Sequence, residues 1–162
     1  MAEIIPQRMT AQSDEEFVVF LIGMQINKLW KLHKWVPVAM AMGRMISELM
    51  EEENSDLLHA ESWGGRTSIM VQYWRSFDAL EAYSKNKSQS HLPAWSKFNK
   101  LTKGNSDVGI WHETYTVEPG SFECVYNNMP LFGLAKATNI VAAEGQRKNA
   151  RDRLAQSKLE ND

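Results

Sequence analysis

The stretch EEFVVFLIGMQIN, residues 15–27, decides the fold of this chain. It is rich in β-branched and aromatic residues and is too short for a buried helix of ordinary length, so it predicts a β-strand. Its alternate positions give two faces, one beginning at Phe17 and one at Val18, and both are apolar along most of their length. A strand with two apolar faces must be covered on both sides.

The segments that follow alternate between helical and strand patterns. Apolar residues recur at helical spacing over residues 36–53, where Pro37 stands at the start, and Ser76 is the expected N-cap of a helix over 76–88. The other expected elements are strands at 57–63 and 67–76 joined through Gly64-Gly65-Arg66, a short helix at 92–101, a strand at 108–117 and a further strand at 121–129. This order predicts an α+β fold of the ferredoxin-like βαββαβ type.

The 162 residues favour a single domain, which we assign to residues 15–137. Residues 1–14 are expected to form an arm without a core role, and residues 138–162 a polar tail. The helices of a ferredoxin-like fold cover one face of the sheet, so the second apolar face of residues 15–27 needs another cover. A second copy of the chain supplies it, which predicts a homodimeric barrel made from two sheets.

Composition excludes several classes of function. The net charge of −2 gives no support for nucleic acid or an anionic membrane as partner, and no apolar run approaches the roughly 18 residues of a membrane span. Because the N-terminus also lacks a secretion signal, we expect a cytoplasmic protein. The single Cys124 excludes a disulfide framework, and no phosphate-binding glycine loop or Ser-His-Asp signature is present. The four histidines lie in four different elements, without metal-site spacing.

Four segments together resemble a known family. They are GMQINKLWKLHKWVPV (23–38), VQYWRSFDALEAYS (71–84), HLPAWSKFN (91–99) and GIWHETYTVEPGSFECVYNNMPLFGL (109–134). These segments resemble the uncharacterised monooxygenase-like family within the dimeric α+β barrel superfamily, which includes antibiotic-biosynthesis and haem-degrading monooxygenases. The resemblance covers about residues 15–137. It implies a dimeric α+β barrel and an oxygenase-type enzyme.

The resemblance also implies candidate catalytic residues. Haem-degrading members of the superfamily use an Asn at the end of the first strand, a Trp on the second main helix and a His after that helix. Asn27 and His91 fall in the first and third of these elements, which makes them the candidate catalytic pair. Tyr83 stands on the helix in place of the Trp, and Gln25 stands where many relatives carry Arg.

Each of these residues also has a structural interpretation. His91 is either a solvated residue at the end of a helix or a general base or iron ligand at a pocket mouth, because an imidazole exchanges protons near neutral pH. Asn27 either bonds the turn that follows the strand or orients oxygen or a substrate carbonyl. His33, on a loop between Trp30 and Trp35, is either part of a packing lid or a second candidate ligand for haem iron.

We therefore expect a small oxygenase-type enzyme that binds a hydrophobic small molecule between its sheet and helices. A base, an amide and a dry cavity suffice for oxygenation without a cofactor when the substrate itself gives an electron to O₂. The alternatives are a haem protein with His91 or His33 on the iron, and a non-enzymatic ligand-binding dimer. The candidate substrate-binding residues are Gln25, Gln72, Trp74, Tyr83, Trp95, Phe98 and Trp111.

Overall fold

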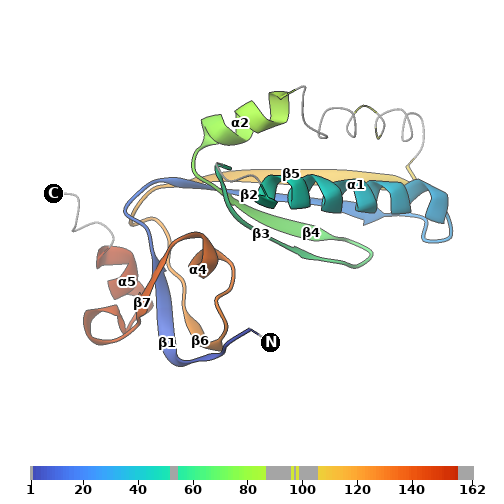
Figure 1. The fold of residues 1–162 in the computed structure, drawn as a ribbon. Helices are drawn as coiled ribbons and strands as arrows, with labels where there is room; N and C mark the ends of the chain where they lie inside the picture. The colour runs from blue at the N-terminus through green and yellow to red at the C-terminus, as the bar shows by residue number, and fades with distance from the viewer. Residues whose placement is uncertain (1, 52–54, 87–95, 97, 99–105, 157–162) are drawn as a thin grey trace.

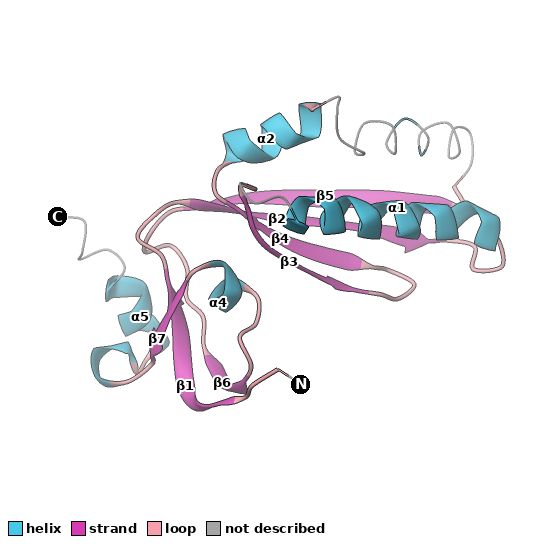
Figure 2. Ribbon diagram, viewed as in Figure 1, coloured by secondary structure: helices cyan, strands magenta, loops and turns pink. Residues whose placement is uncertain are grey.

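The computed structural model describes residues 2–51, 55–86, 96, 98 and 106–156, and contains two antiparallel sheets (Figure 1). The main sheet has four strands and the small sheet has three. Helices lie over one face of the main sheet, and the small sheet lies against one end of its other face (Figure 2). We call these the helix-side face and the second face.

The main sheet has the strand order of the ferredoxin-like fold. It contains β2 (Phe17–Ile26), β3 (Leu57–Trp63), β4 (Ile69–Trp74) and β5 (Val108–Val117), in the order β3-β4-β2-β5. The two-faced apolar strand β2 is one of the two central strands, and β5 pairs with it from Phe17↔Val117 to Ile26↔Val108. The predicted βαββαβ fold is therefore confirmed.

In the continuously described parts of the chain, two helices cover the helix-side face. They are α1 (Leu32–Glu51) and α2 (Phe77–Lys85). The predicted N-cap of α2 is confirmed, because the Ser76 hydroxyl accepts a hydrogen bond from the Ala79 N–H at 3.1 Å. The helix α1 starts four residues earlier than expected, which leaves Pro37 inside it. Trp35 lies in the early turns of α1, packs over the core and donates its indole N–H to the Leu29 carbonyl at 3.0 Å.

The core on the helix-side face is built around Trp74 and Val18, which are 1% and 0% exposed. One cluster joins them to Leu49 of α1 and Leu80 of α2. A second cluster joins Met24, Ile26, Val38 and Val108, with Phe98 packed against it. These two clusters hold α1 and α2 on the sheet, since burying apolar side chains is the main favourable term in folding.

The small sheet was not expected from the sequence. It is formed by β1 (Ile5–Gln12), β6 (Tyr126–Met129) and β7 (Asn139–Ala142), in the order β6-β1-β7. The short helix α4 (Leu134–Ala137) packs with it, and Ala11, Phe17 and Leu134 form their common core. Residues 5–12 are thus a strand with two buried residues, Thr10 and Ala11, where we expected an arm without a core role. Two of the strands have only four residues, too few for a reliable alternation pattern.

The C-terminal segment also differs from the expected polar tail. A 3₁₀ turn (Gly145–Arg147) leads into α5 (Ala150–Gln156). The Arg153 side chain is 5% exposed and forms an ion pair with Glu123, while its other N–H groups donate to the Arg147 and Lys148 carbonyls at 2.9 and 3.0 Å. This segment is therefore anchored to the residues that precede β6.

The rest of the second face stays uncovered. Leu21 and Val71 are half-buried there, and Tyr115 is 50% exposed. At Gly23 the backbone of β2 lies unusually close to the backbone of Ser68. A Cβ at this position would lie 2.0 Å from the Ser68 carbonyl oxygen. Only glycine fits here, because the Ser68 carbonyl occupies the space that a side chain would need.

Candidate functional site

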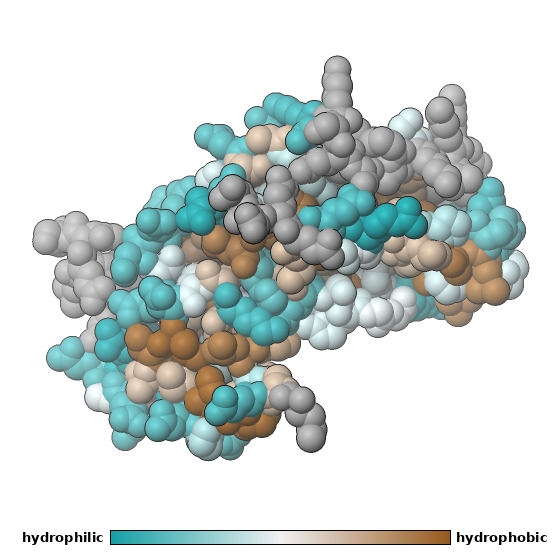
Figure 3. Space-filling view, viewed as in Figure 1, coloured by the Kyte–Doolittle hydropathy of each residue, from teal (hydrophilic) through white to brown (hydrophobic). Residues whose placement is uncertain are grey.

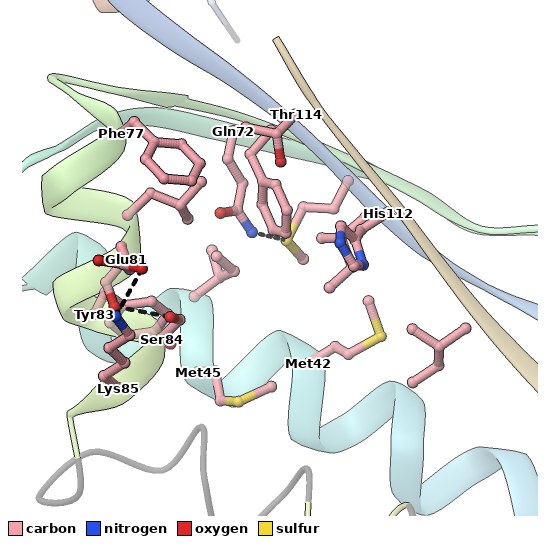
Figure 4. Close-up of a pocket in the computed structure, with 16 residues that line it drawn as sticks. Met42, Met45, Gln72, Phe77, Glu81, Tyr83, Ser84, Lys85, His112 and Thr114 are labelled. Atoms are coloured by element: carbon pink, nitrogen blue, oxygen red, sulfur yellow. Dashed lines mark hydrogen bonds and ion pairs between the residues drawn. The ribbon is translucent and has the colours of Figure 1, made fainter. Parts of the chain in front are cut away.

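A cavity of about 400 Å³ lies between the helix-side face and the two helices (Figure 4). We call it the helix cavity. Its walls are mostly apolar side chains, with polar groups contributed by the sheet and by α2. The lining residues are Phe20, Ile22, Met42, Met45, Ile46, Met70, Gln72, Phe77, Leu80, Glu81, Tyr83, Ser84, Lys85, Ile110, His112 and Thr114.

Strand pairing explains why these residues meet. Side chains alternate between the two faces of a strand, so residues paired directly across neighbouring strands share a face. Phe20 pairs with Gln72 on one side and Thr114 on the other, and Ile22 pairs with His112. Figure 4 shows Gln72 and His112 pointing into the cavity from the sheet, with Met42 and Met45 facing them from α1. An imidazole and an amide therefore face the same apolar space.

Gln72 is held in place by its neighbours on β4. The Trp74 indole N–H donates to Gln72 Oε1 at 2.8 Å, and Gln72 Nε2 donates to the Met70 sulfur at 3.2 Å. A primary amide has two N–H donors, so a second donor is available for a ligand in the cavity. Gln72 is 6% exposed, which satisfies the expectation that a buried glutamine needs partners.

His112 is the functional candidate that the sequence analysis missed. Its ring lies 5.7 Å from that of Phe20, at an angle of 42°. The signal was present in WHETY, because alternation separates His112 and Thr114 from Trp111 and Glu113. Which of the two sets faces the helices depends on the pairing with β2, and a single sequence does not show that pairing.

The α2 side of the cavity carries groups that are already engaged. Burial raises the pKa of Tyr83 to about 12, with a further contribution from the Glu48 carboxylate, so its phenol stays protonated at neutral pH. Tyr83 therefore cannot act as a base there, and its ring packs 5.3 Å from that of Trp74. Glu81 and Lys85 form an ion pair at 2.7 Å, which neutralises both charges at the rim.

The structure divides the expected substrate-binding residues between the two faces. Gln72 and Tyr83 line the helix cavity, and Trp74 lies beneath it. Gln25 and Trp111 lie on the second face, where Gln25 bonds the Thr67 hydroxyl. The Trp111 indole nitrogen is buried without a hydrogen-bond partner among the described residues.

The expected catalytic and iron-binding residues lie away from this cavity or outside the described part of the chain. Asn27 is exposed and donates its side-chain N–H to the Ser106 carbonyl at 2.9 Å, which lies in the segment before β5 and not in the turn that follows β2. His33 is exposed in the first turn of α1 and does not line the helix cavity. His91 and Trp95 lie outside the described residues, whereas Phe98 packs against the core cluster around Met24.

Neither a metal centre nor a membrane span is found in the described part of the chain. No group of three or more His, Cys, Asp or Glu side chains is placed to hold a metal ion within residues 2–51, 55–86 and 106–156. Among the helices that the structure describes, none is both long and apolar enough to cross a bilayer.

A profile of the monooxygenase af470-like family matches residues 17–134. The chain belongs to this family. The expected resemblance is therefore confirmed, and the matched segment runs from the start of β2 to the start of α4. Monooxygenase af470 of Aspergillus fumigatus is 22% identical over 151 residues, covering 79% of this chain and 53% of that protein. This member of the family thus spans about half the length of the curated relative it matches.

The chain is also similar to solved structures. Aldoxime dehydratase OxdRE, in complex with butyraldoxime, has a TM-score of 0.64 at 15% identity, covering 94% of this chain and 44% of that one. SnoaB, a cofactor-independent oxygenase from Streptomyces nogalater, has a TM-score of 0.46 at 11% identity, covering 64% of this chain and 94% of that one. At these identities the likeness to aldoxime dehydratase establishes the fold and leaves the activity open.

Proposed function

We propose that this protein is a small oxygenase-type enzyme that oxidises a hydrophobic small molecule in the helix cavity. Membership of a monooxygenase-like family supports the general class of reaction. The observation that carries the proposal is the arrangement of His112 and Gln72, which point into one apolar cavity of about 400 Å³. A mostly apolar pocket with a few polar groups is the usual form of a small-molecule site. We keep the expected cytoplasmic location as part of this proposal.

The cavity supplies the parts that oxygenation without a cofactor needs. His112 accepts a proton from an acidic C–H group of the substrate, and the free N–H of Gln72 donates to the enolate oxygen that forms. His112 and Thr114 are exposed at the edge of the cavity, so the bound substrate itself must displace water before the electron-rich anion passes an electron to O₂. For an activated methylene group the balance is R₂CH₂ + O₂ → R₂C=O + H₂O, in which the substrate supplies all the electrons.

His91 and Asn27 remain proposed catalytic residues beside this pair. His91 is the second candidate for the base, and Asn27 the second candidate for the orienting amide. Trp95, Phe98, Gln25 and Trp111 remain proposed substrate contacts. Oxygen consumption separates the candidates, because a true base is needed for turnover and a structural residue is not.

The test measures oxygen uptake with anthrone, an apolar tricyclic ketone with an acidic methylene group, and with naphthols. His112→Gln should lower the rate by at least about 10²-fold, the low end for a positioned acid or base. Glu113→Gln is the matched control, because it lies on the same strand and points to the second face. A full rate in His112→Gln combined with a lost rate in His91→Gln would move the base to His91. Asn27→Ala tests the amide in the same assay.

We also propose that the protein acts as a homodimer. Leu21 and Val71 leave an apolar area on the second face that the small sheet does not cover. Light scattering at micromolar concentration should give about twice the chain mass of 18.5 kDa. Leu21→Lys should return the mass to that of one chain while the fold is kept. A wild-type mass near that of one chain would refute the dimer.

Haem binding is the second candidate, supported by an imidazole in an apolar cavity. Haem iron takes a histidine nitrogen as axial ligand, and a bound haem would supply activation of O₂ at the iron. Of the histidines considered, His112 lines the cavity, whereas His91 and His33 are proposed as ligands from the sequence alone. A Soret band in the purified protein that is lost in His112→Gln would favour haem. A colourless protein that binds anthrone without oxygen uptake would instead be a non-enzymatic ligand-binding protein.

A further inference from the structure

A second cavity, of about 470 Å³, lies between α1 and the hairpin that joins β3 to β4. We call it the hairpin cavity. Its walls are largely apolar and come from the end of β2, the start of α1 and the hairpin. Met24, Ile26, Leu29, Trp35 and Ile69 are among the side chains that form them. The proposed chemistry does not use this cavity.

The two cavities share a wall. Met42 of α1 and Met70 of β4 line both of them. Met70 is 6% exposed, and its sulfur accepts a hydrogen bond from Gln72 on the side of the helix cavity. Methionine is unbranched and flexible, and it adapts to a neighbouring ligand more readily than other apolar residues. One elongated molecule can therefore extend past the two methionines and occupy both cavities.

The hairpin cavity has one charged side chain among its described lining residues, that of Arg66. The backbone of Arg66 is fixed, because its carbonyl accepts the Ile26 N–H at 2.7 Å. Its Nε donates to the Ile26 carbonyl at 3.2 Å, which leaves the terminal N–H groups of the guanidinium for another partner. In the described part of the chain no carboxylate forms an ion pair with Arg66.

The charges of the helix cavity offer no comparable cation. Lys85, the lysine among its lining residues, is paired with Glu81 at 2.7 Å. An apolar ligand with one anionic end would therefore find its charge partner at Arg66. Leu29 also lines the hairpin cavity and is 50% exposed, and Figure 3 shows hydrophobic residues gathered at this end of α1.

We propose that the hairpin cavity binds the carboxylate end of an elongated apolar substrate, and that Arg66 selects the anion. This inference rests on the proposed function, because the reacting end of the same molecule lies beside His112 in the helix cavity. A planar guanidinium binds a carboxylate through two parallel hydrogen bonds, which gives both affinity and orientation. Arg66 is thus a specificity residue for the carboxylate, placed at the opposite end of the substrate from the chemistry.

The test measures binding of pyrenedodecanoic acid and its methyl ester to the full chain by fluorescence titration. We expect the acid to bind about tenfold more tightly than the ester, as for one added charge-assisted contact. Arg66→Gln should remove this preference, because it weakens binding of the acid and leaves binding of the ester unchanged. Arg44→Gln is the matched control, because Arg44 is exposed on α1 and lines neither cavity. Equal affinities for acid and ester in the wild-type protein, or equal effects of the two arginine substitutions, would overturn the proposal.

Gly43 provides a second, independent variant. It lines the hairpin cavity from α1, and a Cβ there would meet no atom within 4 Å, so the backbone accepts a side chain. Gly43→Leu should fill the hairpin cavity and weaken the binding of both pyrenedodecanoic acid and its methyl ester at least about fivefold. Unsubstituted pyrene should bind in the helix cavity as before. Gly43→Ala is the control for the helix itself. Unchanged binding of the long probes in Gly43→Leu would refute the hairpin cavity as a subsite.

None of these measurements depends on turnover. A protein that shows the predicted binding pattern but consumes no oxygen would refute the proposed oxygenase and leave the subsite standing. A protein that oxidises anthrone but binds acid and ester equally would refute the subsite and leave the oxygenase standing.

Discussion

The helix-side face of the main sheet is packed under α1 and α2, whereas its second face is covered at one end only. Both faces of β2 are apolar, so hydrophobicity alone does not distinguish them. On the helix-side face, Trp74 and Val18 are almost fully buried beneath a cavity with an imidazole and an amide. On the second face, the small sheet packs at Phe17, and Leu21 and Val71 remain half-buried. The comparison shows that one face carries a cavity with an imidazole and an amide, whereas the other leaves apolar side chains only half-buried.

Trp74→Ala should give the largest loss of stability, because it empties the centre of the helix-side core. A buried tryptophan truncated to alanine costs about 3–5 kcal/mol in the free energy of unfolding. Trp63→Ala is the matched control on the second face, where Trp63 is 42% exposed and contacts Phe132, and it should cost under about 1 kcal/mol. Chemical denaturation measures both, and similar losses would remove the difference between the faces.

Gly23→Ala tests how closely β2 and the start of β4 approach each other. A Cβ at Gly23 would lie 2.0 Å from the Ser68 carbonyl oxygen, so the strands must separate, at a cost of up to about 3 kcal/mol. Gly43→Ala is the counterpart on α1, where the new methyl group meets nothing within 4 Å. That change should stabilise the helix by up to about 1 kcal/mol. Opposite signs in thermal denaturation support the description, and two equal losses contradict it.

Arg153→Ala tests whether the C-terminal segment helps to hold the small sheet. The substitution leaves Glu123 without its partner and frees two carbonyl groups near the start of α5, so we expect a loss of about 2 kcal/mol. Arg151→Ala, on the exposed side of the same helix, should change stability by less than about 0.5 kcal/mol. The melting temperatures of the Arg153→Ala and Arg151→Ala variants are compared to measure this difference in stability. Equal temperatures would restore the interpretation of these residues as a dispensable tail.

Asp107→Asn should have the smallest effect, seen in the pH dependence of stability. Hydrogen bonds from Lys28 and Lys31, at 2.8 and 2.7 Å, lower the pKa of Asp107 from its ordinary value of 3.8 to about 2. A lowered pKa in the folded state stabilises the protein above about pH 4, and this contribution is lost as the pH falls through about 2. The lysines lie in the segment before α1, so this contact fastens the helix-side layer.

The stability advantage of the wild-type protein over Asp107→Asn should therefore shrink between about pH 4 and pH 2, as measured by denaturation midpoints. Asp14→Asn, at an exposed position in the loop before β2, is the control. An advantage that stays constant across this range would show that the two lysines do not hold the carboxylate as described.

The sequence allowed the main sheet and much of its helix layer to be predicted. The bounds of β5, the N-cap Ser76 and the two-faced strand β2 follow from local patterns that neighbouring residues carry themselves. The start of α1 was misplaced, because Pro37 is normally tolerated in the first turn of a helix and here lies further in. Local signals place an element well but fix its ends less securely.

The candidate site was predicted only in part. Gln72 and Tyr83 do line the cavity, but Gln25 and Trp111 lie on the second face and His112 was not chosen. Alternation along one strand sorts residues into two sets without saying which set faces the helices. That assignment needs the register between β2 and its two neighbours, which joins residues about 50 to 100 positions apart.

The sequence by itself determined that β2 has two apolar faces, that the elements follow the βαββαβ order and that the chain resembles its family. Each of these three features depends on residues that are close in the chain or on motifs that are visible in the sequence. The tertiary structure alone decided that residues 5–12 and 139–142 join one small sheet, that Arg153 is buried, and that His112 and Gln72 meet in one cavity. These features depend on contacts between segments that are distant in the sequence. A local periodic pattern of residues does not show which distant segments come into contact.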